Sequence, residues 1–466
     1  MKYAFTNGII LDGTRDMEPI RGKVVLTDGD RIVDIVPGSQ DTPDVQGTPS
    51  TQGEPGESSA LGTSDVPGAP DTFTFDGYET IDLGGAYLLP GLIDLHVHLA
   101  LNGRPPKEKK STKPVNYEKR YKLLTGNPVV RAAAKHLVAS YAKTEVMSGV
   151  TTIRTVGGVL DFDAQIRDEI NAGKRIGPRI IASNTGISVP GGHFAGSIAT
   201  AVSTPEEART LVREISKSAP DLIKLMVTGG VMDADEEGMP GKLKMAPEIV
   251  KAACDEAHKL GYTVAAHVES SEGIRVALEN GVDTIEHGAR LTDEMINLFK
   301  ERKAADICTL SPAIPYAEFP LEESRATPTS KKNGEIVLNG IIECAKACIE
   351  NDIPVGLGSD VSCPFVVHYN FWRELCFFSK YIGRSATETL HRATLGNAEI
   401  AGIGEETGSI EVGKCADLIV VKENPLDDLS ALRNVTMVMA QGRLIRNPKF
   451  KRMPDIDEKL DRLAMK

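Results

Sequence analysis

The 466-residue sequence lacks the features that are typical of membrane proteins and of nucleic-acid-binding proteins. No apolar run is long enough to span a membrane, and the N-terminal residues lack the long apolar core of a secretion signal. A formal net charge of -12 argues against nucleic acid or an anionic membrane as a partner. We therefore expect a cytoplasmic protein that acts on a small molecule.

Cysteine pairs with the Cys-x-x-Cys spacing are also lacking. The seven cysteines, an odd number, are scattered without any Cys-x-x-Cys spacing, which is typical of reduced thiols in a cytoplasm. Cys344 and Cys348 lie four residues apart in a predicted helix. We interpret this pair as packing residues rather than as a site.

The two ends of the chain have the pattern of short β-strands. Residues 1–37 contain apolar runs separated by the hairpin-like turn "DGDR". Residues 39–71 are rich in Gly, Pro, Ser and Thr, which predicts a mobile surface insertion, most simply a long loop without a function of its own. Strand patterns return after residue 404. We predict that residues 1–87 and 405–466 form the two parts of one small β-sandwich domain.

Residues 88–404 alternate between apolar strands, such as "IPVGLGSD", and amphipathic helices, such as "APEIVKAACDEAHKLG". Strand–helix alternation over about 300 residues indicates parallel strands joined by helical crossovers. Eight candidate strands predict an α/β fold, a (β/α)8 TIM barrel with the β-sandwich domain beside it.

Two histidines end the first predicted barrel strand, "YLLPGLIDLHVH". Residues two apart on a strand point to the same face, so His96 and His98 are expected to lie side by side. Two buried imidazoles each need a partner, and one metal ion would satisfy both.

Three further candidate ligands end later strands: His267 in "YTVAAH", His287 in "VDTIEH" and Asp360 in "IPVGLGSD". The carboxyl ends of barrel strands form the face that carries catalytic groups in TIM barrels. The remaining helical histidines, by contrast, are expected to have packing or surface roles: His136, His258 and His391.

Lys224 lies within the apolar strand "DLIKLMVTGG". A lysine is rarely buried without a partner. One interpretation is a carbamate, formed when carbon dioxide adds to the neutral amine, which is an anionic ligand able to bridge two cations. The alternative is a lysine that extends to solvent or pairs with a carboxylate.

These side chains together predict a centre for two divalent metal ions, with zinc favoured over manganese or iron. Two adjacent ions can hold a bridging hydroxide and polarise a scissile carbonyl. Asp360 would act as the catalytic proton carrier between that hydroxide and the leaving amine. The six expected ligands are His96, His98, Lys224, His267, His287 and Asp360.

This ordered set resembles the amidohydrolase superfamily of binuclear metal hydrolases. That family has His-x-His on strand one, a carbamylated lysine on strand four, histidines on strands five and six and an aspartate on strand eight. The stretches "TTIRTVGG", "IKLMVTGGV" and "VDTIEHG" are most similar to the Xaa-Pro dipeptidase (prolidase) and imidazolonepropionase-related branch. The presence of Lys224 favours the prolidase-like side, because the imidazolonepropionase-like sites are mononuclear and lack that lysine. Relatives are often multimers, so the resemblance also implies a homo-oligomer.

The resemblance implies hydrolysis of an amide bond, in a dipeptide of the Xaa-Pro type or an N-acyl amino acid. Two alternatives stay open: hydrolysis of cyclic amides, lactones or similar bonds, and an inactive scaffold of the same fold. Where relatives have an Arg-Asp pair after strand two, this chain has Arg154-Thr155, and Glu269 follows the strand-five histidine, facing either substrate or solvent. The candidate substrate-binding residues are Arg154, His193, Tyr316 and His368.

Overall fold

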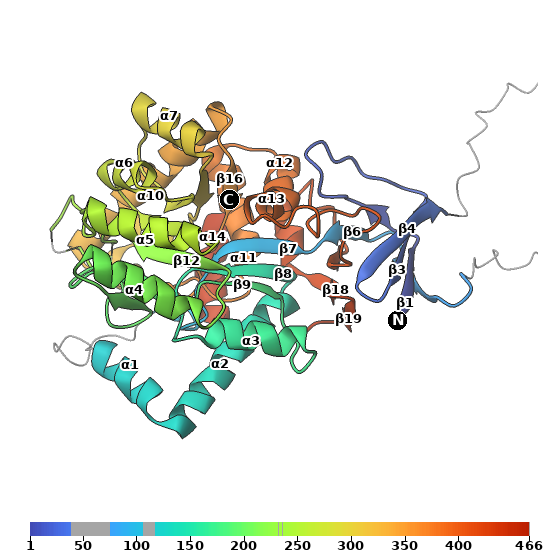
Figure 1. The fold of residues 1–466 in the computed structure, drawn as a ribbon. Coiled ribbons are helices and arrows are strands. Elements are labelled where there is room, and N and C mark those ends of the chain that lie inside the picture. The colour runs from blue at the N-terminus through green and yellow to red at the C-terminus, as the bar shows by residue number, and fades with distance from the viewer. Residues whose placement is uncertain (39–74, 106–116, 232, 235, 466) are drawn as a thin grey trace, which may run out of the picture.

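The computed structural model describes residues 1–38, 75–105, 117–231, 233–234 and 236–465. Parallel strands enclosed by helices form the larger part of the molecule, and two β-sheets that contain the N-terminal strands lie at one side (Figure 1). No helix among these residues combines the length and the apolar character needed to cross a membrane.

The larger part is built on parallel strands. Their bounds are β7 (Leu92–Val97), β8 (Val150–Thr155), β9 (Arg179–Ala182), β10 (Gly186–Ser188), β11 (Ala199–Ala201), β12 (Leu222–Met226), β13 (Thr263–Val268), β14 (Thr284–His287), β15 (Ala305–Cys308) and β16 (Val355–Leu357). They pair as a three-stranded sheet, β7-β8-β9, and a seven-stranded sheet, β11-β10-β12-β13-β14-β15-β16. A parallel bridge between Val97 and Val361 joins the first strand to the segment after the last one. The predicted α/β fold with a TIM-barrel-like parallel sheet is therefore present.

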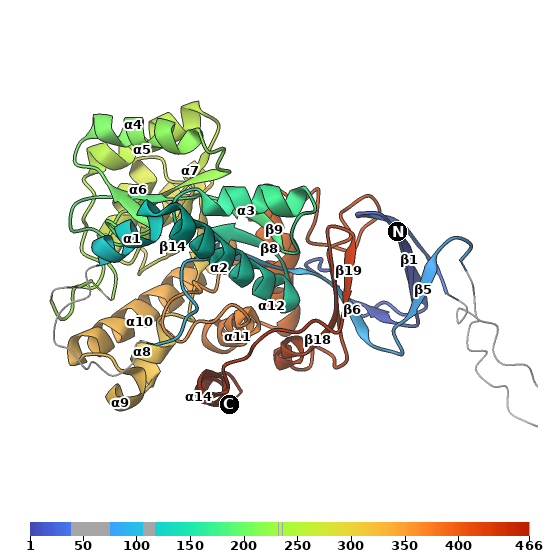
Figure 2. The same cartoon turned by 90° about the horizontal axis from the view of Figure 1, so that it is seen from below.

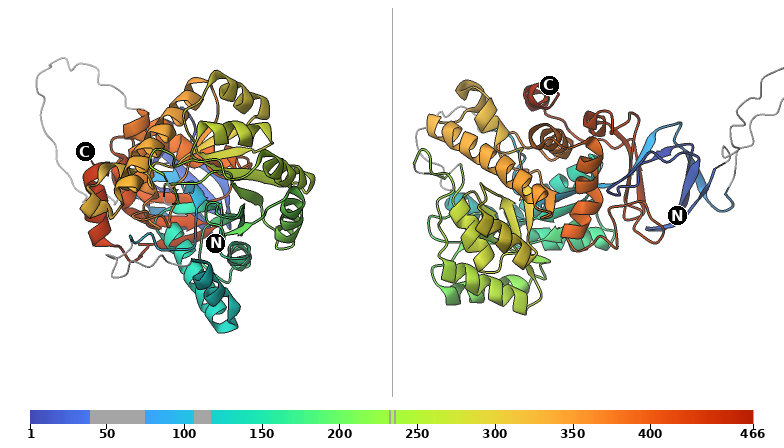
Figure 3. Two further views of the ribbon diagram at one scale, coloured as in Figure 1. Left: turned by 90° about the vertical axis from the view of Figure 1, so that its left-hand side faces the viewer. Right: turned by 90° about the horizontal axis from the view of Figure 1, so that it is seen from above.

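Helices cover the outside of these strands (Figure 3). The α-helices between the first and last strands, and just beyond them, are α1 (Tyr117–Gly126), α2 (Pro128–Met147), α3 (Phe162–Asn171), α4 (Pro205–Ser216), α5 (Pro247–Lys259), α6 (Ser271–Glu279), α7 (Asp293–Arg302), α8 (Ile314–Glu318), α9 (Leu321–Ser324), α10 (Pro328–Glu350), α11 (Phe371–Phe377), α12 (Ala386–His391) and α13 (Asn397–Ile400). Hydroxyl side chains at Thr204, Ser270, Thr292 and Thr327 cap the first turns of α4, α6, α7 and α10. Because the helices bury the outer face of the sheet, a strand such as β7 is buried at every position.

Two smaller sheets combine both ends of the chain. Their strands are β1 (Lys2–Thr6), β2 (Ile9–Ile10), β3 (Lys23–Asp28), β4 (Arg31–Pro37), β5 (Glu79–Asp82), β6 (Tyr87–Pro90), β17 (Leu418–Val421), β18 (Val435–Ala440) and β19 (Arg443–Arg446). The sheet orders are β4-β3-β1-β5 and β19-β18-β17-β6-β2, and β3 and β4 form the predicted hairpin. Apolar side chains from both sheets, such as Phe5 and Leu418, share one buried cluster. The insertion predicted at 39–71 lies outside the described residues.

Two elements differ from the expectation. The single strand predicted for "YLLPGLIDLHVH" is divided: β6 pairs with β17 in the small sheet, and β7 starts the barrel. Gly91 separates them, and a Cβ there would lie 2.0 Å from Oγ1 of Thr151, so only glycine allows this close crossing.

The second difference concerns the end of the chain, which was expected to belong entirely to the β region. Helix α14 (Pro454–Ala464) leaves the sheets and lies beside α11 (Figure 2). Its apolar residues Ile456 and Leu460 pack in a cluster with Phe319 and Phe365. The buried guanidinium of Arg373 also forms an ion pair with Asp457 of this helix, at 2.9 Å. An amphipathic helix is held by the apolar face that it covers, and here that face belongs to the barrel.

Candidate metal centre

The structure brings the six predicted ligands together at the carboxyl ends of the parallel strands. Five strands and the loops that follow them supply the side chains, which line one pocket: His96, His98, Lys224, His267, His287 and Asp360. Asp360 lies three residues beyond the end of β16, and His98 follows directly after β7. All six residues are less than a tenth exposed.

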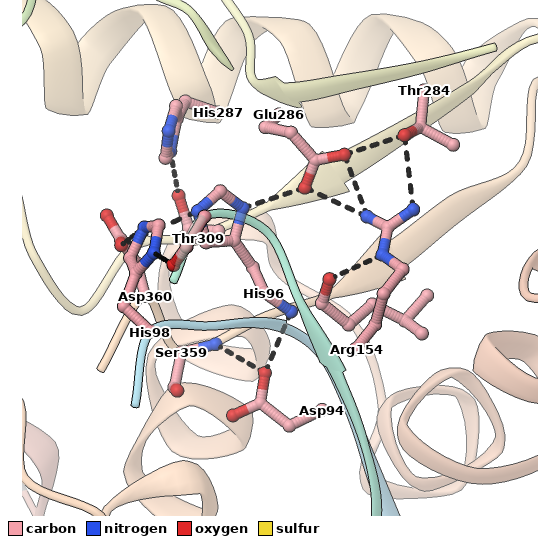
Figure 4. Close-up of polar contacts among 12 residues, drawn as sticks. Asp94, His96, His98, Arg154, Thr284, Glu286, His287, Thr309, Ser359 and Asp360 are labelled. Carbon is pink, nitrogen blue, oxygen red and sulfur yellow. Dashed lines mark hydrogen bonds and ion pairs between the residues drawn. The ribbon is translucent and has the colours of Figure 1, made fainter. Parts of the chain in front are cut away.

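The imidazoles and the carboxylate are close neighbours (Figure 4). Oδ1 of Asp360 lies 3.5 Å from Nε2 of His96 and 3.3 Å from Nε2 of His98. These three residues alone form a possible metal site, since one ligand atom of each lies within 4.8 Å of the others. The ring of His287 lies 4.8 Å from that of His96 and 4.6 Å from that of His267, between ring centroids.

Hydrogen bonds at the outer ring nitrogens orient three of the histidines. Nδ1 of His96 donates to Glu286 at 2.7 Å, and Nδ1 of His98 donates to the carbonyl of Gly157 at 2.9 Å. Nδ1 of His287 lies 2.6 Å from the hydroxyl of Thr309. In each ring Nε2 therefore remains available for a metal ion, and partners of this kind fix the tautomer and orientation of metal-binding histidines.

His267 has the opposite orientation. Its Nε2 lies 3.2 Å from the carbonyl of Gly229, which leaves Nδ1 as the nitrogen available for coordination. The ring stacks on His193, with centroids 4.1 Å apart and planes 7° from parallel.

The protonation states suit a metal centre. Burial lowers the pKa of His96 and of His267 well below the usual value, and it lowers the pKa of His287 to about 4, so these rings are neutral at pH 7. Burial opposes the charge on Asp360, but the surrounding imidazoles, first His96, lower its pKa below the usual range. Neutral imidazoles and an ionised carboxylate are the forms that bind a divalent cation.

Lys224 is buried in the pocket without a hydrogen-bond partner within the described ranges of the chain. The residue is 1% exposed, and its Nζ has no hydrogen-bond partner among the described residues. Burial lowers the pKa of this amine to about 8. A buried, unpaired amine that is partly neutral can add carbon dioxide to form a carbamate. With such a carbamate, the donor set fits a binuclear metal centre better than it does with an unmodified lysine.

The backbone at this end of the barrel is strained. His287 has φ of 76° and Asp360 has φ of 53°, values in the left-handed region that residues other than glycine seldom adopt. Strain of this kind persists only where the surrounding structure enforces it, and it gathers at functional sites.

The four candidate substrate-binding residues divide into two pairs. His193 and Tyr316 line the pocket. His193 also contacts Asp233, with 3.0 Å between Nδ1 and Oδ1.

Arg154 and His368, by contrast, do not line it, which corrects the expectation for both. Nε of Arg154 donates to the carbonyl of Leu95 at 2.7 Å, and its terminal nitrogens bind Thr284 and Glu286, so no nitrogen is left for a substrate. The reason is its position: the side chain is directed into the barrel interior, where a charged group requires partners.

His368 connects secondary-structure elements instead of binding substrate. Its two ring nitrogens lie 2.8 Å from Glu145 of α2 and 2.8 Å from the carbonyl of Leu101, and its ring stacks on Tyr141. Burial lowers its pKa to about 4. For a histidine in a loop after a barrel strand, the sequence does not indicate whether the side chain will face the pocket or the surrounding helices.

Sequence reasoning missed Glu286. This carboxylate is fully buried, and it binds both His96 and Arg154. The available signal was a charged residue next to a histidine inside the apolar strand "VDTIEHG".

Glu269, which was expected to face either substrate or solvent, lines the pocket with a side chain that is 9% exposed. Burial, followed by the charges of Asp233 and Asp360, raises its pKa well above the usual range.

A second group of possible ligands lies between β15 and α10. Asp306, Cys344 and Cys348 are buried there, and the Cys344 thiol donates to Asp306 at 3.5 Å. The Cys348 interaction and burial raise the pKa of the Cys344 thiol well above its usual value. Both cysteines also belong to the main buried apolar cluster. This agrees with packing roles for the two cysteines.

The chain is similar to known proteins in sequence and in structure. The sequence pattern of the Amidohydrolase family covers residues 87–445. The structure of a candidate prolidase from Bifidobacterium longum is 34% identical, with a TM-score of 0.80, and the match covers 100% of this chain and 99% of that one. The structure of an Xaa-Pro dipeptidase with bound methionine in its active site is 28% identical, with a TM-score of 0.74, covering 96% of this chain and 100% of that one. Ochratoxinase from Aspergillus niger is 25% identical over 397 residues, which are 78% of this chain and 76% of that protein.

The fold and the site define a hydrolase that acts on carbon–nitrogen bonds. The chain belongs to the amidohydrolase family, with prolidases and Xaa-Pro dipeptidases among its structural neighbours.

Proposed function

We propose that the protein hydrolyses the amide bond of a small substrate that carries a free carboxylate, either a dipeptide of the Xaa-Pro type or an N-acyl amino acid. The reaction uses two divalent ions, with zinc favoured, and a carbamate on Lys224. The observation that carries this proposal is the convergence of six ligand-type side chains on one pocket, with Nζ of Lys224 buried and unpaired.

The donor set would suffice for two ions. His96 and His98, held by Glu286 and Gly157, would present Nε2 to one ion, with Asp360 beside them. His267 and His287 would hold the second, and a carbamate on Lys224 would supply a further anionic ligand.

The ions supply an acidified water and polarise the scissile carbonyl. The protein moves the proton. The Asp360 carboxylate, ionised at neutral pH because its pKa is depressed, accepts the proton of the attacking water and passes it to the leaving amine. It lies close to both His96 and His98, so it would be next to an ion that these histidines hold.

The substrate class is supported by the pocket and by the relatives. His193 and Tyr316 lie where a carboxylate of the substrate could be bound. A prolidase-like fold with an Xaa-Pro dipeptidase among its neighbours favours a dipeptide, and the likeness to ochratoxinase supports amide hydrolysis more generally.

Metal analysis combined with a substrate panel tests the proposal. Purified protein is expected to contain two equivalents of a zinc-like metal and to hydrolyse Xaa-Pro dipeptides or N-acyl amino acids. Turnover of hydantoins or lactones instead would favour the cyclic-substrate alternative. A sample free of metal yet fully active would overturn the mechanism, and a metal-free, inactive sample would indicate a scaffold.

We also propose that the two small sheets, from residues 1–87 and the strands after 405, form one β-sandwich domain beside the barrel. The buried apolar cluster shared by both sheets supports this division. The seven cysteines are all free thiols, which supports a reducing compartment such as the cytoplasm.

A further inference from the structure

Glu269 lies at the edge of the pocket as a carboxylate without a cation. It follows β13 two residues after His267, and its Oε2 is buried with no hydrogen-bond partner among the described residues. The other polar contact recorded for the carboxyl group is a hydrogen bond from the backbone of Val231. Nε2 of His267 lies 4.0 Å from Oε1, beyond hydrogen-bond distance, and is already engaged by the Gly229 carbonyl.

A second carboxylate stands beside it. Oδ1 of Asp233 accepts hydrogen bonds from the backbone of Gly230 and contacts Nδ1 of His193, but its Oδ2 is buried and unpartnered. In the part of the chain that the structure describes, no lysine or arginine forms an ion pair with Asp233 or Glu269. The charges that act on Glu269 come from Asp233 and Asp360, and both are negative.

Two neighbouring carboxylates with unsatisfied buried oxygens are costly unless one of them takes up a proton or a positive group lies between them. The proposed metal ligand His267 lies 4.0 Å from Oε1 of Glu269, but its Nε2 is engaged by the Gly229 carbonyl. The ligand set has its own carboxylate in Asp360. A positive group on the substrate is therefore the partner that these oxygens lack.

The pocket also has room in this direction. Glu269 and Val337 line both the metal pocket and an adjoining groove of about 500 Å³, whose other wall includes residues 238–243. A substrate that reaches past the metal centre would pass the Glu269 carboxylate.

We propose that Glu269, with Asp233 beside it, forms a subsite for a primary ammonium group of the substrate. The inference rests on the proposed amidohydrolase function and narrows its substrate class, since an N-acyl amino acid without an amine cannot use the subsite. The ammonium group can be the free α-amino group of a dipeptide or the side-chain amine of a lysyl residue.

Paired substrates with and without the amine test the subsite. The zinc-loaded wild type is compared on Ala-Pro and acetyl-Ala-Pro, which differ at the α-amino group, and on acetyl-Ala-Lys and acetyl-Ala-norleucine, which differ at the side chain. In one of these pairs the amine-bearing substrate is expected to have the higher kcat/KM. Glu269→Gln is expected to reduce that preference about 10- to 100-fold, which corresponds to the loss of one charge-assisted hydrogen bond. Glu272→Gln is the matched control, because this exposed residue of α6 lines the groove but not the metal pocket.

Three measurements separate the possible failures. Unchanged preference in both pairs with normal turnover overturns the subsite and leaves the hydrolase function standing. Loss of metal from Glu269→Gln overturns it as well, because Glu269 would then be a metal ligand. If wild type hydrolyses none of the substrates, calorimetry measures how tightly the same pairs bind to Asp360→Asn and to the double variant Asp360→Asn with Glu269→Gln. Tighter binding of the amine-bearing substrates that Glu269→Gln abolishes supports the subsite without the proposed reaction. Binding that does not depend on the amine overturns the subsite.

Discussion

Two buried polar clusters lie next to each other in the barrel, and they differ in how far they are satisfied (Figure 4). In the first, Arg154 binds Glu286 through one nitrogen and Thr284 through another, and Thr284 donates in turn to Glu286 at 2.7 Å. In the second, the metal pocket, Nζ of Lys224 has no partner and Asp360 lies against two imidazoles.

The difference indicates which cluster supports the fold and which awaits a ligand. A closed network of charges is complete without any other molecule, and it stabilises one arrangement of the strands. Unpaired donors, strained backbone and neutral imidazoles are costly for folding and useful only when a cation binds. Glu286 joins the two clusters, because its Oε2 accepts hydrogen bonds from both Arg154 and His96.

The largest expected effect comes from removing the unsatisfied amine. Lys224→Ala is expected to lose metal and to reduce activity below detection, because the amine on which the proposed carbamate would form is gone. Small carboxylic acids, which mimic the carbamate, should restore part of both. Metal analysis and turnover check this, and wild-type turnover without added acid would contradict the bridging role.

Asp360→Asn should lower kcat by about 10²- to 10⁴-fold, since the proton carrier is lost while most ligands stay in place. Metal content measured on the same sample is expected to stay close to that of wild type. A near-normal rate would show that another group moves the proton.

Breaking the satisfied cluster should act on stability. Arg154→Met leaves Glu286 as an uncompensated buried charge, and we expect the free energy of unfolding to fall by about 3–5 kcal/mol. Urea unfolding of the metal-free protein measures this. Arg275→Met, which removes an exposed ion pair with Glu279 on α6, is the control and should have a much smaller effect. Equal losses in the two variants would remove the distinction between the clusters.

The smallest expected effect concerns pH. Carbamate formation needs the neutral amine, and a pKa of about 8 for Lys224 makes that form about fivefold more abundant at pH 8 than at pH 7, but less than twofold more abundant again at pH 9. The rate at which zinc and carbon dioxide activate metal-free protein, measured at constant dissolved carbon dioxide, should follow this curve. A tenfold rise for each pH unit up to pH 9 would mean that the amine keeps its ordinary pKa.

The parallel α/β architecture was predictable because the strands are short apolar runs and several helices, such as α4 and α10, have an amphipathic period and a capping residue of their own. The convergence of the candidate ligands on one pocket was predictable for a related reason: strand ends of a parallel barrel share one face, so position along the chain indicates position in space. His96, His98, His267 and His287 all follow that rule.

The direction in which individual side chains point, and hence the partners that they meet, was not predictable in the same way. Arg154 lies on a barrel strand and His368 in the segment after the last one, but both side chains bind internal partners. The division of the first strand at Gly91 depends on its contact with Thr151. These outcomes depend on groups far away in sequence.

By itself, therefore, the sequence determined the order of strands and helices and the chemical identity of the groups at the barrel mouth, because period, capping and residue type are local properties. Only the tertiary structure decided which charged groups are paired and which are not. Arg154 is paired with Glu286, whereas Glu269 lies beside another carboxylate, Asp233. Pairing depends on distances between distant segments, and those distances exist only once the core has packed.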